Sequence, residues 1–409
     1  MFLNFESRSF ESVIAMIRCG KIAKKLALLE RRSRDLCLEI FGNTGVSAIK
    51  KLFCGLLDKK FFAAGPSYVS IAVTNQCNYH CPYCFSYLPY QMSGENKEQE
   101  RIKYSNAFVS MEIFQKLICD LWELNPKAVI FFNYSGNIMI GEPFLHPDLI
   151  KMCAYAQSKG FDFSVLSNGS LVSAEQAKAL IDLKVRNVCI SLNASSPQVH
   201  AKITQASPES YGKVVEMLKL LIKRRNESCS PKTQIAVSQV ICSLNYHEVL
   251  SFAKLGLELG VDEVIYRKLA FCRRSKQLVG RLLLDDRQRT DLKRLLSEVV
   301  LMEKADSRLR TNANSFLHAV LRGELNRPMD YYRNSRDLLE HAVIMGNGAV
   351  YAMDHSDVMG NLNENSFADI WYSNHYRSLR RNAGNFDGEL FPCYPYCNGC
   401  GEALRKLQK

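Results

Sequence analysis

The chain has 409 residues, of which 47% are hydrophobic and 23% are charged, and these fractions exclude a disordered or fibrous protein. No run of about 18 apolar residues occurs, and Arg18 and Lys21 interrupt the most apolar N-terminal stretch, so the sequence predicts neither a membrane-spanning helix nor a signal peptide. We therefore expect a cytoplasmic protein. The net charge of +12 suits an acidic partner, a nucleic acid or an anionic surface, although a solvated helical face explains it as well.

Residues 1–65 are predicted to form a basic helical segment. Leucine, isoleucine and valine recur there near helical spacing, and Lys and Arg stand between them. Such a segment could cover part of a domain or rest on a membrane surface. We favour the first, because the apolar stripe is weak.

Residues 66–280 are predicted to form an α/β domain. Strand-like runs cover 68–73, 128–132, 162–166, 187–192, 234–241 and 263–266, and helix-like runs cover 112–124, 149–158, 174–183, 211–225 and 246–259. Six strands that alternate with helices indicate parallel pairing through right-handed crossovers. Functional residues should then lie at the C-terminal ends of the strands. Periodicity alone does not distinguish a closed barrel from an open sheet.

A cluster of three cysteines follows the first predicted strand. Cys77, Cys81 and Cys84 share one short loop, whereas most of the 15 cysteines are scattered singly. Clustered cysteines in a cytosolic chain indicate a metal site rather than disulfides. Three thiolates can hold three irons of a [4Fe–4S] cluster and leave the fourth iron open. The alternative is a structural zinc site with His80 as the fourth ligand, although four ligands within eight residues fit a tetrahedral site poorly.

Three further polar motifs follow at the expected ends of the next strands. They are Gly141-Glu142-Pro143, Ser167-Asn168-Gly169 and Ser191-Leu192-Asn193. Each motif alone is an ordinary turn or strand-end cap. Their order behind a C-x3-C-x2-C loop with Tyr83 before the last cysteine resembles the radical S-adenosylmethionine (SAM) superfamily over residues 67–270. The resemblance implies a partial (β/α)6 TIM-type barrel.

The resemblance also implies the cofactors. A [4Fe–4S] cluster would be held by the three cysteines, and SAM would chelate the open iron through its amino and carboxylate groups. One electron from a reductant such as flavodoxin or ferredoxin would then cleave SAM to methionine and a 5′-deoxyadenosyl radical, which removes hydrogen from a C–H bond of the substrate. No catalytic acid or base can be assigned from the sequence.

Individual SAM contacts follow from the same resemblance. Gly141, Glu142 and Pro143 would meet the amino group of SAM, and Tyr83 would lie near the adenine. The ribose and carboxylate would meet the strand end that carries Ser191 and Asn193. The expected cofactor-binding residues also include Ser167, Asn168 and Gln239.

Two departures from the family pattern concern this site. Ile140 stands where the family usually has a first glycine, a change that backbone contacts would tolerate. Thr204 or Gln205 occupies the region where related chains often have an arginine, and Lys202 is the candidate that could replace it as the partner of the SAM carboxylate.

Basic residues follow the sixth predicted strand. Gln239, Tyr266 and Arg267 are expected to face the barrel mouth. A basic run past that strand could bind a phosphate or carboxylate of the substrate, although it could equally be a solvated loop. The run consists of Arg267, Lys268, Arg273, Arg274 and Lys276.

The chain continues with a predicted helical linker over 281–340, containing helices at 285–303 and 312–325, and a small domain over 341–409. The runs 342–344 and 349–352 flank Gly346-Asn347-Gly348, which predicts a β-hairpin. A second cluster follows with Cys393, Cys397 and Cys400. This end resembles the SPASM or twitch extension of radical SAM enzymes, which binds auxiliary iron–sulfur clusters.

The resemblance implies one auxiliary [4Fe–4S] cluster on Cys393, Cys397 and Cys400. Relatives often have another cysteine after the hairpin, where this chain has Ala352-Met353-Asp354-His355. Asp354, His355, another cysteine or the substrate could provide the fourth ligand. A structural zinc site that uses His355 is the alternative.

The sequence leaves the substrate open. A small anionic metabolite, such as a sugar or polyol derivative, competes with a peptide or protein side chain. Residues 1–65 lack the strand pattern of a peptide-recognition domain, which weakens the peptide hypothesis. A non-enzymatic zinc- or nucleic-acid-binding protein would suit the basic charge and the cysteines, but it leaves the ordered motifs unexplained, so no nucleic-acid partner is expected.

Overall fold

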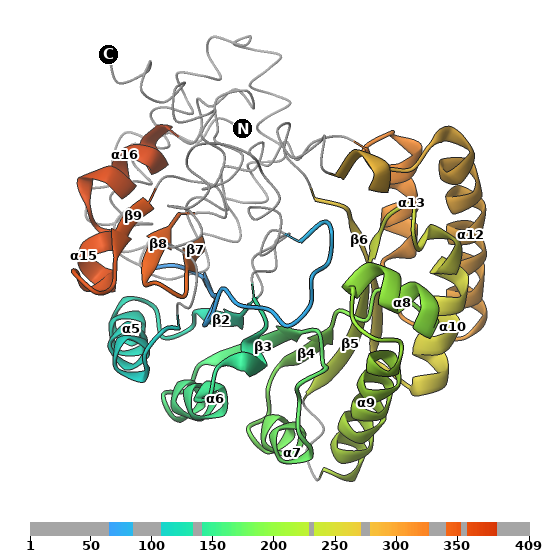
Figure 1. The fold of residues 1–409 in the computed structure, drawn as a ribbon. Coiled ribbons are helices and arrows are strands. Elements are labelled where there is room, and N and C mark those ends of the chain that lie inside the picture. Colours follow the sequence, from blue (N-terminus) through green and yellow to red (C-terminus); the bar gives the residue numbers. More distant parts are fainter. Residues whose placement is uncertain are drawn as a thin grey trace, which may run out of the picture. The chain divides into compact units, whose positions relative to one another are not determined.

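The computed structural model describes residues 65–84, 108–133, 141–228, 233–270, 279–326, 341–352 and 358–382. The predicted basic segment 1–65 lies almost entirely outside these residues. Within them, strands and helices alternate from residue 68 to residue 268, as the sequence predicts (Figure 1). None of the described helices is long and apolar enough to cross a membrane.

A nine-stranded sheet organises the fold. Its order is β6-β5-β4-β3-β2-β1-β7-β8-β9, and every pairing from β6 to β7 is parallel. The predicted six-stranded parallel unit is therefore confirmed. The strands are β1 (Tyr68–Ile71), β2 (Val129–Phe132), β3 (Asp162–Ser167), β4 (Asn187–Ile190), β5 (Gln234–Ile241), β6 (Glu263–Lys268), β7 (His341–Ile344), β8 (Ala349–Tyr351) and β9 (Val358–Asn361).

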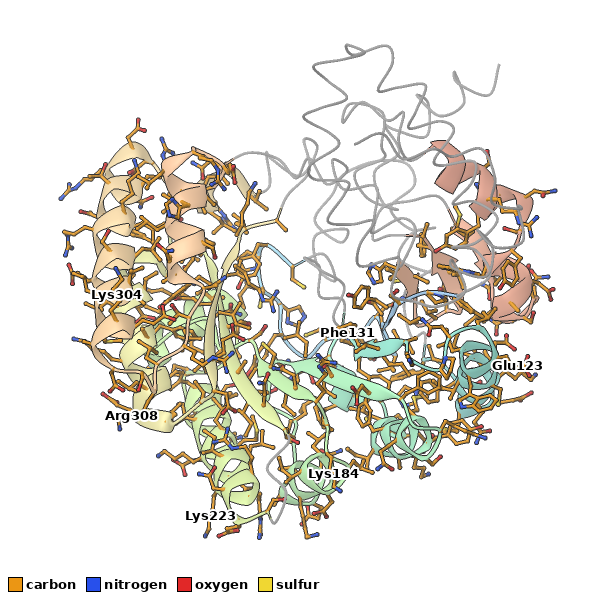
Figure 2. The ribbon with its side chains drawn as sticks, turned by 180° about the vertical axis from the view of Figure 1, so that it is seen from behind. Glu123, Phe131, Lys184, Lys223, Lys304 and Arg308 are labelled. Atoms are coloured by element: carbon orange, nitrogen blue, oxygen red, sulfur yellow. The ribbon has the colours of Figure 1, made fainter. Side chains whose placement is uncertain are left out.

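Helices connect these strands and cover one face of the sheet (Figure 1). Figure 2 shows Lys223 and Lys304 on the outer sides of their helices, in contact with solvent. The helices are α5 (Met111–Leu124), α6 (Leu149–Ser158), α7 (Ala174–Asp182), α8 (Pro197–Thr204), α9 (Glu209–Glu227), α10 (Val249–Leu259), α12 (Asp286–Ala305), α13 (Ala313–Leu321), α15 (Phe367–Trp371) and α16 (Asn374–Asn382), with 3-10 turns at Pro143–Leu145, Tyr246–Glu248 and Gly280–Leu282.

The core explains why these runs fold as they do. Alternate residues of each parallel strand point to the helical layer, because successive side chains of a strand point to opposite faces. Phe132, Phe163 and Val188 belong to this set and are almost completely buried. Helix α5 buries Phe114, Leu117, Ile118 and Leu121 against them, which is the spacing of one helical face.

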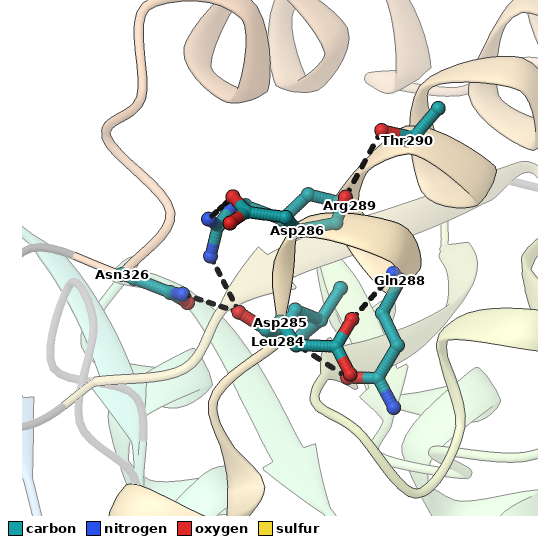
Figure 3. Close-up of polar contacts among 7 residues, drawn as sticks. All are labelled: Leu284, Asp285, Asp286, Gln288, Arg289, Thr290 and Asn326. Carbon is teal, nitrogen blue, oxygen red and sulfur yellow. Dashed lines mark hydrogen bonds and ion pairs between the residues drawn. The ribbon is translucent and has the colours of Figure 1, made fainter.

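Capping residues set the beginnings of several helices. Ser110 and Ser173 accept backbone hydrogen bonds at the starts of α5 and α7. At α12, Gln288 N donates to Asp285 Oδ1 at 2.8 Å and Asp285 N donates to Gln288 Oε1 at 3.1 Å (Figure 3). Asn326 Nδ2 donates to Leu284 O beside this box at 2.6 Å, which ties the segment after α13 to the start of α12.

The C-terminal hairpin joins the barrel sheet. The predicted hairpin is confirmed as β7 and β8, which pair antiparallel. The sequence did not predict that β7 also pairs in parallel with β1. The pairing is supported by a 2.8 Å hydrogen bond between Ser70 Oγ and His341 Nε2 and by Asp120, which accepts a hydrogen bond from Phe367 N at 2.6 Å. The described part of the C-terminal region therefore shares the core of the barrel.

One prediction concerns the packing of α10 on the sheet. At Gly256, an added Cβ would lie 2.3 Å from Val264 Cγ2, so Gly256→Ala should lower the free energy of unfolding by about 1–3 kcal/mol. Gly212 in α9 has nothing within 4 Å of such a Cβ, and Gly212→Ala should be neutral or stabilise the protein by about 0.5–1 kcal/mol. Chemical denaturation of both variants checks this, and equal effects would contradict it.

Candidate iron–sulfur and SAM site

The cysteine loop begins where β1 ends. Its backbone is held by Val73 O, which accepts from Val109 N at 2.9 Å, and by a turn in which Cys84 N donates to Cys81 O at 2.9 Å. Cys77, Cys81 and Cys84 are all partly buried and free of disulfides. The loop thus carries its three thiols at the C-terminal end of the central strand, as the sequence predicts.

The electrostatics of the loop fit a cationic cofactor. Burial, Cys84 and Glu142, in that order, raise the pKa of the Cys77 thiol to about 12. Burial first, then Cys84 and Cys77, raise the pKa of Cys81 as well. Iron–sulfur clusters are bound by thiolates, so a bound cation must offset the cost of burying these negative charges close together. The donor set therefore fits a cluster, which supplies that positive charge.

The described side chains do not converge on a single metal ion. No group of three or more His, Cys, Asp and Glu side chains within the described ranges could hold one ion. The Cys77, Cys81, Cys84 and His80 set of the zinc alternative is therefore not drawn together in this geometry. Thiolates that bind three different irons need not converge on one point, so this geometry leaves the cluster hypothesis intact.

Glu142 lies directly beneath the cysteine loop and is completely buried. Glu142 Oε1 accepts from Ser167 Oγ at 2.7 Å, and Oε2 accepts from Asn168 N at 2.7 Å. Its own backbone N donates to Gln76 O at 2.6 Å. These bonds join the cysteine loop, the segment after β2 and the end of β3.

Gly141 allows this close approach. It has a φ of +73°, and an added Cβ would lie 2.0 Å from Thr74 O on the cysteine loop. Glycine is required there because any side chain would collide with backbone. Pro143, next to Glu142, begins a 3-10 turn. The structure thus brings the first two predicted motifs together.

Ser167, Asn168 and Gly169 close the site at the end of β3. Asn168 Nδ2 lies 3.8 Å from Cys77 Sγ and donates to Asn78 Oδ1 at 2.9 Å. Tyr79 N also donates to Cys77 Sγ, at 3.4 Å. The third predicted motif therefore reaches the first cysteine directly.

Ser191 and Asn193 lie one strand further along. Ser191 Oγ is 3.3 Å from Ser238 Oγ, which joins the ends of β4 and β5. Asn193 has a φ of +63°, and its Oδ1 accepts from Val240 N at 2.8 Å. These residues hold the β4 and β5 ends together beside the cysteine loop.

Tyr83 lies in a second apolar cluster at the C-terminal ends of the strands. Ala72, Ala194 and Cys242 are among its neighbours in this cluster. Its hydroxyl is buried without a hydrogen-bond partner among the described residues. Such a surface suits a flat apolar group such as a purine ring.

The expectation that Gln239 and Tyr266 face the barrel mouth needs correction. Tyr266 belongs to the core between sheet and helices, and its hydroxyl donates to Val249 O at 2.9 Å. Gln239 alternates with the same helix-facing residues of β5, and its Nε2 donates to Asn245 O at 3.2 Å. Arg267 follows Tyr266 directly on β6, so its side chain points to the opposite face of the strand. It shares this inner face with Ile265.

Helix α8 is not among the helices that the sequence predicts. Ser196 caps it and Pro197 occupies its first turn, a combination that could have revealed it. Its C-terminal Thr204 O accepts from His80 N at 3.0 Å, so α8 supports the cysteine loop. Lys202, the expected substitute for the missing arginine, is exposed, whereas His200 packs between Tyr79 and Tyr211 and is fully buried.

Several predicted site residues lie outside the described part of the chain. They are the C-terminal Cys393, Cys397 and Cys400, the candidate ligands Asp354 and His355, and the basic residues Arg273, Arg274 and Lys276.

Comparison with known proteins agrees with this geometry. Residues 71–231 match the radical SAM superfamily, and residues 337–401 match an iron–sulfur cluster-binding domain, SPASM. The chain therefore belongs to the radical SAM superfamily and has a C-terminal SPASM domain. It is a radical SAM enzyme whose cofactors are a [4Fe–4S] cluster and SAM, and the non-enzymatic alternative is set aside.

Individual relatives differ in what they do. The chain is 26% identical to the tungsten-containing aldehyde ferredoxin oxidoreductase cofactor-modifying protein of Pyrococcus furiosus, over 81% of this chain and 86% of that protein. It is 27% identical to the GTP 3′,8-cyclase of Nautilia profundicola, over 50% of this chain and 57% of the cyclase. It is 25% identical to the S-adenosylmethionine-dependent nucleotide dehydratase of Selenomonas ruminantium, over 49% of this chain and 66% of the dehydratase.

Solved structures show the same fold. SuiB of Streptococcus suis bound to S-adenosylmethionine has a TM-score of 0.57 and 14% identity, covering 87% of this chain and 78% of SuiB. The structure named anSMEcpe, with bound AdoMet and the Cp18Cys peptide, has a TM-score of 0.55 and 16% identity, covering 78% of this chain and 84% of that chain. The partial barrel fold is therefore confirmed.

Buried Glu142 gives the cluster-free protein a pH-dependent stability. Burial raises the pKa of Glu142 from 4.5 to about 7, so its protonated form is favoured in the folded chain. The stability that the protonated Glu142 gives to the folded chain is fully present below pH 4.5 and is lost as the pH rises through about 7. The unfolding free energy of the wild type, relative to Glu142→Gln, should fall by up to about 3 kcal/mol across this range.

Denaturation of both cluster-free proteins at a series of pH values measures the difference. Glu303→Gln is the matched control, because Glu303 also accepts two hydrogen bonds but is only partly buried. A constant difference between wild type and Glu142→Gln would contradict the prediction.

Proposed function

We propose that this enzyme uses Cys77, Cys81 and Cys84 to hold the SAM-cleaving cluster and removes hydrogen from a C–H bond of a small anionic substrate. The single observation that supports the site is that hydrogen bonds of 2.6–3.8 Å join the cysteine loop to Glu142 and Asn168 and join these two residues to each other. When bound, the cluster and SAM supply a 5′-deoxyadenosyl radical.

The chain's own residues would bind and orient SAM. Gly141, Glu142 and Pro143 would receive its iron-bound amino group, whose N–H groups would donate hydrogen bonds to backbone oxygens of this segment. Tyr83 would pack on the adenine from the apolar cluster at the mouth. Ser191 and Asn193 would contact the ribose and carboxylate at the ends of β4 and β5.

An anionic substrate is supported by the inner face of β6. Arg267 projects to the side of the sheet opposite the helices, and Lys268 ends the same strand. A guanidinium presents fixed donors to a phosphate or carboxylate. Two relatives are named for reactions on GTP or on a nucleotide, which carry such groups. A peptide remains the competing substrate class.

A second cluster would use Cys393, Cys397 and Cys400 in the SPASM domain. Three thiolates again leave one iron for another ligand, for which Asp354, His355, another cysteine or the substrate are the candidates. A one-electron donor such as flavodoxin or ferredoxin would supply the reducing equivalent. Anaerobic iron analysis should give about eight irons per chain with both clusters and about four with one.

Cysteine substitution tests the cluster assignment. Cys81→Ala should lower the iron content by about four per chain and abolish formation of 5′-deoxyadenosine, because an iron loses its thiolate. Cys153→Ala is the matched control, since Cys153 is buried in α6 and should leave the iron content unchanged. Full iron content and SAM cleavage in Cys81→Ala would contradict the assignment.

A substrate panel tests the second part. Phosphorylated or carboxylated metabolites should raise 5′-deoxyadenosine above the uncoupled level, whereas their neutral analogues and peptides should not. Arg267→Gln should raise the half-saturating concentration at least about tenfold, because a charge-assisted pair is lost. Arg308→Gln, an exposed change (Figure 2), is the control. Stimulation by peptides alone would support the competing class instead.

A further inference from the structure

Asn168 is the described side chain that joins the first cysteine to the rest of the site. Its amide nitrogen lies 3.8 Å from Cys77 Sγ, and the residue is 3% exposed. Solvent therefore contributes little to the hydrogen bonding of this amide. Its backbone N separately donates to Glu142 Oε2 at 2.7 Å, so one residue contacts both a proposed cluster ligand and a residue of the segment proposed to receive the SAM amino group.

The orientation of the Asn168 amide is fixed by its neighbours. Ser170 N, which can only donate, lies 2.9 Å from Asn168 Oδ1, and Ser170 Oγ donates to the same oxygen at 2.7 Å. The oxygen therefore faces Ser170, and the nitrogen must face Cys77. Asn78 Oδ1 accepts the other amide hydrogen at 2.9 Å, and Asn78 Nδ2 donates to Ser170 Oγ at 2.8 Å.

A local turn explains only half of this arrangement. Asparagine at a strand end commonly accepts from the backbone two residues later, which accounts for the contact of Oδ1 with Ser170 N. The turn makes no use of Nδ2. Its direction toward Cys77 Sγ is therefore a separate feature, and a closed network of three side chains holds it in place.

We propose that Asn168 is a positioning residue that donates an N–H···S hydrogen bond to Cys77 and thereby raises the reduction potential of the SAM-cleaving cluster. Hydrogen bonds to the sulfurs help to set the potential of an iron–sulfur cluster. The added electron increases the negative charge on the ligand sulfurs, so this donor stabilises the reduced state more than the oxidised state. The inference rests on the proposed function, in which Cys77 is a cluster ligand.

The experiment is a redox titration of the anaerobically reconstituted full chain without SAM, followed by the EPR signal of the reduced cluster, with iron per chain measured on the same samples. Asn168→Ala removes the donor and leaves the backbone bond to Glu142 in place. At a fixed potential, the ratio of reduced to oxidised cluster should fall about tenfold, equivalent to about 59 mV for a one-electron couple. An unchanged midpoint with full iron content would overturn the proposal.

Asn78→Ala is the second variant, because the exposed side chain of Asn78 orients Asn168 Nδ2 by accepting its other hydrogen. Asn78→Ala should shift the midpoint potential in the same direction by a smaller amount. If Asn168→Ala retains no iron, this shift alone tests whether the hydrogen bond to Cys77 raises the potential. Asn312→Ala is the matched control: this asparagine ties α13 to Tyr266 with two hydrogen bonds far along the sheet, and the midpoint should not move.

Three outcomes count against the tuning role. They are an unmoved midpoint in Asn78→Ala, an equal shift in Asn312→Ala, and loss of iron from both site variants, which would assign the network to cluster assembly instead. Failure of the proposed function looks different, because the wild-type chain would then show no reducible SAM-cleaving cluster, or Cys77→Ala would leave that cluster's signal unchanged.

Discussion

A buried carboxylate joins the parts of the site. Glu142 has no exposed surface, and its two oxygens accept from Ser167, Asn168 and Phe144. Because an unpaired buried charge is costly, these donors must stay in place for the carboxylate to ionise. The same requirement fixes the cysteine loop, since Gln76 O accepts from Glu142 N. Stability and cofactor geometry thus depend on one set of hydrogen bonds.

The sheet extends this constraint to the C-terminal region. Strand β1, which leads into the cysteine loop, pairs with β2 on one side and β7 on the other. Strand β7, which lies within the SPASM match, is therefore part of the sheet that carries the SAM-cleaving site. Trp371 of α15 and Tyr376 of α16 are buried in the same hydrophobic core as the barrel, so this part of the C-terminal region packs as one body with the barrel sheet.

Much of the fold was predictable because its signals are local. Alternating strand and helix periods gave all six strands of the barrel, and three cysteines in eight residues marked the cofactor loop. Helix α8 has only eight residues, too few for a clear helical period, and Gln239 faces the helices because it lies two residues after Val237 on the same face of β5. The hydrogen bond of Asn168 to Cys77 spans 91 residues, and no local pattern contains it.

The sequence by itself determined the superfamily, the cofactor chemistry and the order of the motifs, since thiol spacing and strand periodicity are properties of short segments. Only the tertiary structure decided which motifs meet. Parallel pairing brings residues from different segments to one edge of the sheet, and this pairing depends on side chains far apart in the chain, as at Ser70 and His341. The burial that raises the pKa of Glu142 likewise arises only when those segments pack together.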